Sequence, residues 1–317
     1  MTGGKSVVLT YVDLTDEARR TLEPYAEVYD GRRDDLGDIL PLVEVIICFK
    51  LDVNHLSKMK NLRLIQSVAA GVDALPWDRI PDDVIVCSNA GSNDSAVAEH
   101  AWAFILSLVK NLHIHTRNMK ENRYTPTVGV GLIEGRTIGI IGLGAIGRRI
   151  AEIAKAFRMR VLAVTRSGKS SFECDFIGGP ESIDKVLEES DVVVVATPLT
   201  KHTRNMINKE KLRKMKKNAI LVNIARAAVI HREDLLEFLR ENPEFRLASD
   251  VWWNTNERFH EDYEFMKFPN VLGTPWIAGG LGNDEVWRNM VNKAAENVAR
   301  FLKGEKPLNI VYKSDYV

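Results

Sequence analysis

The sequence predicts an α/β protein built from parallel sheets, and three observations lead to that fold class. With 317 residues the chain exceeds the usual size of a single core, so two domains are expected. Short apolar runs alternate with segments of helical periodicity, which is the order that parallel sheets with crossover helices require. The third observation is a glycine-rich turn between an apolar run and an amphipathic segment, within residues 136–150.

Composition excludes several classes of protein. The net charge is +0, with 45% hydrophobic and 27% charged residues, which describes an ordinary globular chain. No strongly basic surface is predicted, so nucleic acid is not an expected partner. No apolar run approaches the roughly 20 residues that span a bilayer, so no membrane association is expected either.

The first residues and the cysteines favour a cytoplasmic location. Residues 1–5 lead directly into the strand-like Ser6–Thr10 and lack the long apolar core of a signal peptide. Cys48, Cys87 and Cys174 lie far apart and show no metal-ligand spacing. Free thiols suit a reducing compartment, and no metal site is predicted.

The first part of the chain, from Ser6 to about Asn89, alternates short strands with helical stretches. The expected elements are 7–9, 16–23, 43–49, 55–59, 62–67 and 84–87. The segment Leu64–Asp73 ends a strand in the small residues Ala69, Ala70 and Gly71. Small residues let backbone N–H groups approach an anion such as a carboxylate. A tight turn before Pro76 explains the same residues equally well.

A long helix is predicted for residues 93–111, capped by one of the polar residues 92–95. Glu99 and His100 lie on it, and a structural contact is the favoured interpretation over a catalytic dyad, because ion-pair networks often perturb titratable groups without function. His113 and His115 follow near its end, without a third metal ligand nearby. Residues 124–134 form a loop that could line a cleft.

The glycine turn carries the first functional prediction. Thr137–Ile141 is a strand, Gly142, Gly144 and Gly147 follow at G-x-G-x-x-G spacing, and residues 145–157 show helical periodicity. The first glycine permits a tight turn, the second leaves room for a pyrophosphate, and the third lets helix and strand pack closely. Tight turns alone can demand glycine, but the flanking strand and helix favour a dinucleotide whose phosphates lie at the helix N-terminus.

The segment after the next strand, residues 160–164, predicts which dinucleotide is preferred. NAD-binding sites usually place an acidic residue there, about 20 residues past the glycines, to hold two ribose hydroxyls. This chain has Thr165-Arg166-Ser167-Gly168-Lys169 instead. An arginine beside hydroxyl and lysine groups can bind a 2′-phosphate, so NADP is predicted to be preferred and NAD remains possible. The alternative is that Arg166 is only a solvated loop charge.

The remaining strands bring further polar and aromatic residues to one edge. Strands are predicted at 191–197, 219–223, 246–251 and 271–273. Ligands of open α/β sheets bind beyond the carboxyl ends of the strands, where Thr197, Arg226, Asp250 and Trp276 fall. These residues are expected to line one crevice. Asp284–Leu302 is predicted to be a closing helix, and residues 307–311 an extended segment that returns to the first domain.

In the order of these motifs, the chain resembles the D-isomer-specific 2-hydroxyacid dehydrogenases, a family that includes glyoxylate and hydroxypyruvate reductases, phosphoglycerate dehydrogenase and formate dehydrogenase. The resemblance covers nearly the whole chain. It rests on residues 70–73 (AGVD), 96–100 (AVAEH), 142–147 (GLGAIG), 197–200 (TPLT), 222–226 (VNIAR) and 250–251 (DV).

The resemblance implies two Rossmann-like, doubly wound domains and a homodimer. Residues 1–95 and 285–317 would form the substrate domain, and residues 96–284 the dinucleotide-binding domain. It also implies a 2-oxo acid substrate whose carboxylate is held by Arg226 and by backbone groups of Ala70 and Gly71, while Asp250 contacts the nicotinamide carboxamide. The expected cofactor-binding residues are Gly142, Gly144, Ala145, Ile146, Gly147, Arg166, Ser167, Thr197, Pro198, Ala225 and Asp250.

The chain departs from the family at the proton donor. The family uses a histidine in T-P-H-I-A-G, tuned by an upstream glutamate, whereas residues 274–279 read T-P-W-I-A-G and place Trp276 at the histidine position. Thr255 occupies the glutamate position, and Glu257 would need a local insertion to replace it. An indole N–H donates a hydrogen bond but releases no proton at neutral pH. Loss of a general acid typically costs a factor of about 10² to 10⁴ in rate.

Two functional hypotheses follow. The first is an NADP-dependent oxidoreductase with an altered site, in which Arg226 orients the substrate, Trp276 packs against it or donates a hydrogen bond to it, and the proton comes from water or another side chain. Tyr124, His113 and His115 are candidates for that side chain, although surface roles are favoured for them. The second is a nicotinamide-nucleotide-binding sensor or partner protein without this activity, since fold alone does not imply function.

Overall fold

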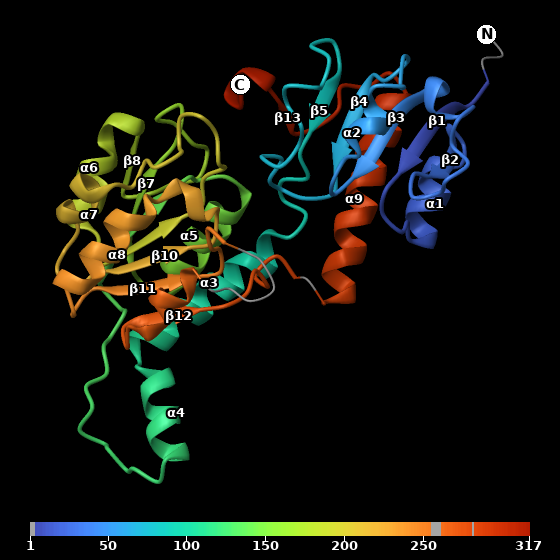
Figure 1. Ribbon diagram of the computed structural model, residues 1–317. Helices are drawn as coiled ribbons and strands as arrows, with labels where there is room; N and C mark the ends of the chain where they lie inside the picture. Colours follow the sequence, from blue (N-terminus) through green and yellow to red (C-terminus); the bar gives the residue numbers. More distant parts are fainter. Residues whose placement is uncertain (1–3, 255–260, 281) are drawn as a thin grey trace. The chain divides into compact units, whose positions relative to one another are not determined.

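The computed structural model describes residues 4–254, 261–280 and 282–317, and the chain divides into two compact units. Unit 1 comprises Met1–Asn93 and Gly282–Val317, and unit 2 comprises Asp94–Leu281. The boundaries expected from the sequence, 1–95 with 285–317 and 96–284, lie two or three residues away from these. Each unit is described by itself below (Figure 1).

Unit 1 contains a six-stranded sheet in the order β13-β5-β4-β3-β1-β2. Five strands are parallel, as predicted, and β13 pairs antiparallel with β5 through Ile310 and Cys87. The closing segment therefore returns to this sheet. The strands are β1 Ser6–Thr10, β2 Ala26–Asp30, β3 Val43–Cys48, β4 Leu64–Ser67, β5 Ile85–Cys87 and β13 Ile310–Val311.

Helices cover both faces of this sheet because successive strand residues point to opposite sides. Val8 and the helices α1 (Asp16–Leu22) and α9 (Asp284–Leu302) share one core. Leu9 belongs to the core on the other face, together with the short helix α2 (Val53–Leu56). Burial on both faces explains why these strands read as nearly continuous apolar runs.

Unit 2 contains a seven-stranded parallel sheet in the order β12-β11-β10-β9-β6-β7-β8. The order reverses between β9 and β6, which makes this pair the topological switch point. The strands are β6 Thr137–Ile141, β7 Arg160–Val164, β8 Phe176–Gly178, β9 Val192–Val195, β10 Ile220–Asn223, β11 Arg246–Ser249 and β12 Val271–Gly273.

Two groups of helices sandwich the sheet of unit 2. The helices α3 (Asp94–Val109) and α5 (Ala145–Ala156) share one core, and α6 (Ile183–Glu189), α7 (Lys209–Lys214) and α8 (Arg232–Glu241) share the other. Short 3₁₀ helices occur at Leu40–Leu42, Pro180–Ser182, Ala227–Val229, Asp262–Lys267 and Lys313–Asp315. Among the described helices, none combines the length and apolar character that a membrane span requires.

One helix of unit 2 differs from the sequence-based expectation. Residues 112–120, which lie between the predicted helix 93–111 and the predicted loop 124–134 and were assigned to no element, form a separate helix, α4 (Leu112–Lys120). Asn111, in the left-handed conformation with φ of 51°, separates it from α3. We define α4 and the loop of residues 121–135 as the projecting arm, since both extend away from the sheet of unit 2 (Figure 1).

Candidate functional site

The glycine turn has the geometry that its three glycines predict. Gly142 has a φ of +101°, and a Cβ there would lie 2.7 Å from the carbonyl oxygen of Ala196. A Cβ on Gly147 would overlap the carbonyl oxygen of Gly142. Gly144 differs, since no atom lies within 4 Å of the position its Cβ would take. The structure therefore needs the first and third glycines for its own packing and leaves open space beside the second.

The helix that follows this turn begins without a side-chain cap. Gly144 is the N-cap of α5, and it has no side chain to accept from the first-turn N–H groups. The first helical bond runs from Arg148 to Gly144, so the N–H groups of Ala145, Ile146 and Gly147 point beyond the helix end. Three N–H groups and the positive end of the helix dipole suit a phosphate. The residues present therefore fit a dinucleotide pyrophosphate.

The other predicted residues of unit 2 lie along the same edge of its sheet. We call this the carboxyl edge, because all seven parallel strands end there. Trp276 follows β12, Asp250 follows β11, Ala225 and Arg226 follow β10, and Thr197 with Pro198 follows β9. The glycine turn follows β6, and Arg166 with Ser167 follows β7. The sheet order thus lines up residues that lie more than one hundred positions apart in sequence.

The turn after β7 presents polar side chains to solvent. Gly168 has a φ of +67° and its N–H lies 3.4 Å from the carbonyl oxygen of Thr165, which makes a tight turn. The hydroxyl of Ser167 donates to the Lys169 carbonyl at 3.3 Å. Arg166, Ser167 and Lys169 are all exposed. The turn carries no carboxylate within residues 165–169, as the sequence indicates.

The loop after β10 is held by its own asparagine. Asn223 donates from its side chain to the Arg226 carbonyl at 3.1 Å and accepts from the N–H of Ala225 at 3.1 Å. The backbone of Arg226 is extended, and one guanidinium N–H donates to the Ala225 carbonyl at 2.9 Å. These three hydrogen bonds hold the start of the Arg226 side chain at the carboxyl edge.

Asp250 organises the segment that contains Trp276. Its carboxylate is only 2% exposed and accepts from the Thr274 hydroxyl at 2.6 Å and from the N–H groups of Ile277 and Ala278 at 2.9 and 2.8 Å. The carbonyl of Asp250 also accepts from the N–H of Trp276 at 2.9 Å. A buried carboxylate needs such partners, so these bonds explain both its burial and the shape of the turn.

Trp276 occupies an unusual conformation for its residue type. Its φ is 59°, in the left-handed region that non-glycine residues seldom adopt, and its side chain is 42% exposed. Strained, exposed residues of this kind concentrate at functional sites. The Thr255 and Glu257 positions of the expected glutamate lie outside the described residues.

His100 makes a contact that sequence reasoning did not find. Its Nε2 lies 2.8 Å from the Thr274 hydroxyl and 3.9 Å from the Asp250 carboxylate. Burial, the larger influence, lowers the pKa of the His100 imidazole, and the Asp250 carboxylate offsets only part of that effect. The favoured structural-contact interpretation of His100 agrees with this geometry, but the partner is 174 residues away, and no local pattern identifies it.

The predicted anion-binding residues of unit 1 lie after β4. The carbonyl of Ala69 accepts from the N–H of Asn89 at 2.9 Å, and the Asn89 side chain donates to the Val68 carbonyl at 2.9 Å. Within the described ranges, no protein group accepts from the N–H groups of Ala70 and Gly71. These two donors are therefore available to a ligand.

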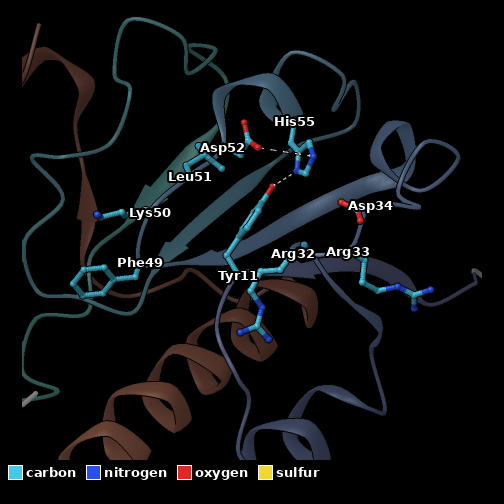
Figure 2. Close-up of a pocket in the computed structure, with 10 residues that line it drawn as sticks. Tyr11, Arg32, Arg33, Asp34, Phe49, Lys50, Leu51, Asp52 and His55 are labelled. Carbon is cyan, nitrogen blue, oxygen red and sulfur yellow. Dashed lines mark hydrogen bonds and ion pairs between the residues drawn. The ribbon is translucent and has the colours of Figure 1, made fainter. Parts of the chain in front are cut away.

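A separate pocket of about 710 Å³ lies in unit 1 at the carboxyl ends of β1, β2 and β3 (Figure 2). Within it the Tyr11 hydroxyl lies 2.9 Å from Nδ1 of His55. Its arginines, Arg32 and Arg33, are paired with carboxylates of neighbouring aspartates. Because these charges are compensated, the pocket has no clear preference for anions, and none of the predicted site residues lines it.

The structure places the three candidate proton donors at the wrong end of unit 2. The helix α3 runs from the carboxyl edge, where His100 meets Thr274, to the opposite edge, where the Leu108 carbonyl accepts from Arg246 at the start of β11. The projecting arm begins there, so Tyr124, His113 and His115 lie far from Arg226 of the same chain. Both ends of the arm attach to this opposite edge, so the loop of residues 124–134 is not part of the carboxyl edge of unit 2.

Two parallel-sheet units, one with an open glycine turn at a helix N-terminus, define a dinucleotide-binding α/β protein. The family is established by sequence. Residues 102–278 match the family described as "D-isomer specific 2-hydroxyacid dehydrogenase, NAD binding domain", and the chain belongs to this family. The predicted resemblance and the predicted fold of two Rossmann-like domains are confirmed.

Curated relatives agree with this assignment. The chain is 32% identical over 271 residues to the glyoxylate reductase of Aeropyrum pernix, covering 83% of this chain and 80% of the relative. It is also 32% identical over 304 residues to the glyoxylate reductase of Pyrococcus furiosus, covering 92% and 89%.

Solved structures show the same architecture. A protein from Pyrobaculum aerophilum, provisionally described as a formate dehydrogenase, is 38% identical and superposes with a TM-score of 0.87 over 98% of this chain and 99% of that one. D-lactate dehydrogenase from Aquifex aeolicus, solved with NAD and lactic acid, is 26% identical with a TM-score of 0.75 over 95% and 96%.

Proposed function

We propose that this chain transfers hydride between NADP(H) and a small 2-oxo or 2-hydroxy acid, or a related carbonyl compound, with a proton donor other than the histidine of its family. The observation that carries the proposal is the open side of Gly144 above the uncapped end of α5, on the same sheet edge as Arg226. Family membership supports the reaction class.

Such a reaction requires groups that bind the substrate carboxylate, polarise the carbonyl group and supply the proton. The Arg226 guanidinium is planar and permanently charged, so it suits bidentate binding of the substrate carboxylate and polarisation of the carbonyl. The N–H groups of Ala70 and Gly71 are proposed as further donors to the substrate. The bound nicotinamide would exchange a hydride with the carbonyl carbon, and the protein must then provide a proton to the oxygen.

The proton donor is the altered part of the proposed site. Trp276 stands at the histidine position, and an indole donates a hydrogen bond without releasing a proton. We assign Trp276 the role of packing against the substrate or donating to it, and Thr255 stands at the position of the tuning glutamate. The proton would then come from water or from another side chain.

Turnover with a substrate panel tests the proposal directly. NADPH oxidation should be measured with glyoxylate, hydroxypyruvate and longer 2-oxo acids, with and without the double change Trp276→His and Thr255→Glu. A general acid contributes a factor of about 10² to 10⁴, so the double variant should reduce glyoxylate or hydroxypyruvate faster by that order. An inert double variant would contradict the assignment of positions 276 and 255.

The preference for NADP rests on Arg166 and its neighbours. Arg166→Asp should weaken NADPH binding and improve NADH binding, because it exchanges a phosphate donor for a carboxylate that holds ribose hydroxyls. Arg149→Ala is the matched control, since Arg149 is an exposed arginine of α5 that pairs with Glu152. An unchanged NADPH-to-NADH affinity ratio in Arg166→Asp would remove the phosphate role.

The second candidate function is a nucleotide-binding sensor or partner protein. It is favoured by the proposed assignment of Trp276 and Thr255 to the family positions of the histidine and the glutamate. Tight NADPH binding without turnover of any carbonyl compound in the panel would support the sensor. Turnover by the natural chain would exclude it.

We also propose that the chain forms a homodimer through the projecting arm. This arm carries exposed apolar side chains, which monomers seldom collect in one place. Tyr124 is 81% exposed, and the others are Leu112, Met119, Val130 and Leu132. Sedimentation analysis should give a dimer, and replacing Tyr124, Val130 and Leu132 with serine should give monomers. A wild-type monomer would contradict the proposal.

The cysteines support a cytoplasmic location, which we likewise propose. Cys48, Cys87 and Cys174 are free thiols. Burial raises the pKa of Cys48 to about 12 and that of Cys87 to about 11, so both remain protonated and unreactive. Protein isolated without reductant should release three titratable thiols on denaturation, and a disulfide would contradict the assignment.

A further inference from the structure

The Thr274 hydroxyl lies between two groups that compete for its single proton. Nε2 of His100 is 2.8 Å away on one side, and Oδ1 of Asp250 is 2.6 Å away on the other. A hydroxyl carries only one hydrogen, so Thr274 can donate to one of these groups and must accept from the other if both bonds exist. The direction of the two bonds therefore determines the protonation of His100.

The surroundings of Asp250 settle that direction. Two backbone N–H groups, from Ile277 and Ala278, donate to its carboxylate, which identifies it as an acceptor. Because each oxygen of this carboxylate already accepts from a backbone N–H, Thr274 is assigned as a further donor to Asp250. Nε2 of His100 must then carry a hydrogen and donate to Thr274. Because burial lowers the pKa of the imidazole, the ring is neutral near pH 7 and its Nδ1 is unprotonated.

This arrangement leaves one acceptor position on Asp250. The two carboxylate oxygens offer about four lone-pair sites. Thr274 and Ile277 donate to Oδ1, and Ala278 donates to Oδ2. The remaining site is on Oδ2, at the carboxyl edge where the proposed coenzyme site lies. It suits an N–H donor such as a carboxamide.

We propose that His100 is a positioning residue that donates from Nε2 to the Thr274 hydroxyl, directs that hydroxyl to Asp250, and so keeps Oδ2 of Asp250 available to the amide of the coenzyme. The inference rests on the proposed coenzyme site. It joins three elements, since His100 lies on α3, Asp250 follows β11 and Thr274 follows β12. Without the imidazole donor, the Thr274 hydroxyl would be free to turn away from Asp250.

The first test needs no coenzyme. The ¹⁵N chemical shifts of His100, assigned by comparison with His100→Gln, report which ring nitrogen carries the hydrogen. Wild-type protein should show a protonated Nε2 and an unprotonated Nδ1 near pH 7, and Thr274→Val should reduce that preference. A hydrogen on Nδ1 in the wild-type protein would overturn the inference.

The second test measures NADPH affinity by fluorescence titration in the absence of substrate. His100→Phe removes the donor but keeps a ring, and it should weaken NADPH binding about tenfold, the scale of one hydrogen bond to a charged group. His100→Gln retains an N–H donor and should bind within about threefold of wild type on the same scale. Phe104→Leu is the packing control, because Phe104 contacts the His100 ring edge at 4.5 Å between centroids and offers no hydrogen bond.

The outcomes separate this inference from the proposed function. Equal NADPH affinity in wild type and His100→Phe, or an equal loss in Phe and Gln variants, overturns the positioning role while leaving the reaction untouched. Binding that follows the expected order without turnover of any carbonyl substrate supports His100 and removes the proposed reaction. A wild-type chain that binds neither coenzyme overturns both.

Discussion

The two units contain the same structural motif, a first strand leading through a turn into a helix, but the helix ends differ in chemistry. In unit 1, Thr15 caps α1, and its side chain accepts from the N–H of Ala18 at 3.0 Å. In unit 2, Gly144 stands at the N-cap of α5 and offers no side-chain acceptor. The same topology thus produces one helix end that the protein closes and one that it leaves open.

This difference shows why the fold alone does not define a binding site. A threonine cap stabilises its helix by satisfying an N–H group that would otherwise need water or a ligand. A glycine N-cap leaves that N–H group to a partner, and at Gly144 the space beside it is also free. Among the described residues, the helix that follows the first strand of unit 2 directs N–H donors at open space, whereas the corresponding helix of unit 1 is capped.

The largest effect is expected at Gly147, where the structure itself needs glycine. Gly147→Val would force a side chain onto the Gly142 carbonyl and should lower the free energy of unfolding by about 3 kcal/mol. Urea unfolding followed by circular dichroism measures this. Gly37→Ala is the control, since Gly37 has open space around it and should change stability little. Equal stability of the two variants would contradict the packing role.

The next effect separates binding from folding. Gly144→Val places a side chain in open space, so unfolding should change little, whereas NADPH affinity should fall about a hundredfold, or about 2.7 kcal/mol, because the side chain occupies the proposed pyrophosphate position. Isothermal titration calorimetry measures the affinity. Undiminished binding would show that no phosphate approaches this turn.

A smaller effect is expected at the capped helix. Thr15→Ala removes the acceptor for the Ala18 N–H and should reduce the free energy of unfolding by about 1 kcal/mol. Coenzyme affinity should stay at the wild-type value, because Thr15 belongs to unit 1 and the glycine turn belongs to unit 2. Thr15→Ser, which keeps the cap, should restore most of the stability. A loss of NADPH binding in Thr15→Ala would contradict this division between the units.

The smallest effect concerns the pH dependence of stability. Folding lowers the pKa of His100 below its unfolded value of about 6.5. Its contribution is therefore fully present above about pH 6.5 and is lost as the pH falls through the folded pKa. His100→Gln keeps a donor but does not titrate, so its stability should decline less steeply between about pH 7 and pH 5. If the urea midpoints of wild type and His100→Gln changed equally across that range, the lowered pKa of His100 would be contradicted.

Several elements were predictable because their signals are local. The strand Thr137–Ile141, the glycine turn and the helix Asp284–Leu302 have the predicted bounds, since apolar periodicity and glycine spacing act over a few residues. Four of the described strands and α-helices were missed, namely β2, β8, α4 and α6. The strand β2 reads A-E-V-Y-D and pairs only with β1, at the edge of its sheet, so its polar residues hide the strand pattern.

The site was predictable in part for the same reason. The residues that follow each strand could be assigned to one edge, because parallel strands end together. The position of the candidate donors in the projecting arm could not be, since the direction in which α3 crosses the sheet places Tyr124 at the far edge. The contact of His100 with Thr274 also depended on which strand α3 packs beside, whereas Glu99 is exposed.

By itself, the sequence determined the fold class, the family and the glycine turn, because these depend on side-chain periodicity and on backbone conformations that glycine alone adopts easily. Tertiary structure decided that Gly144 faces open space, that the arm begins at the edge opposite the carboxyl edge, and that His100 meets Thr274 beside Asp250. The last of these features requires residues 100, 250 and 274 to lie within a few ångströms of one another. Contacts between residues so far apart in sequence form only when the core is folded.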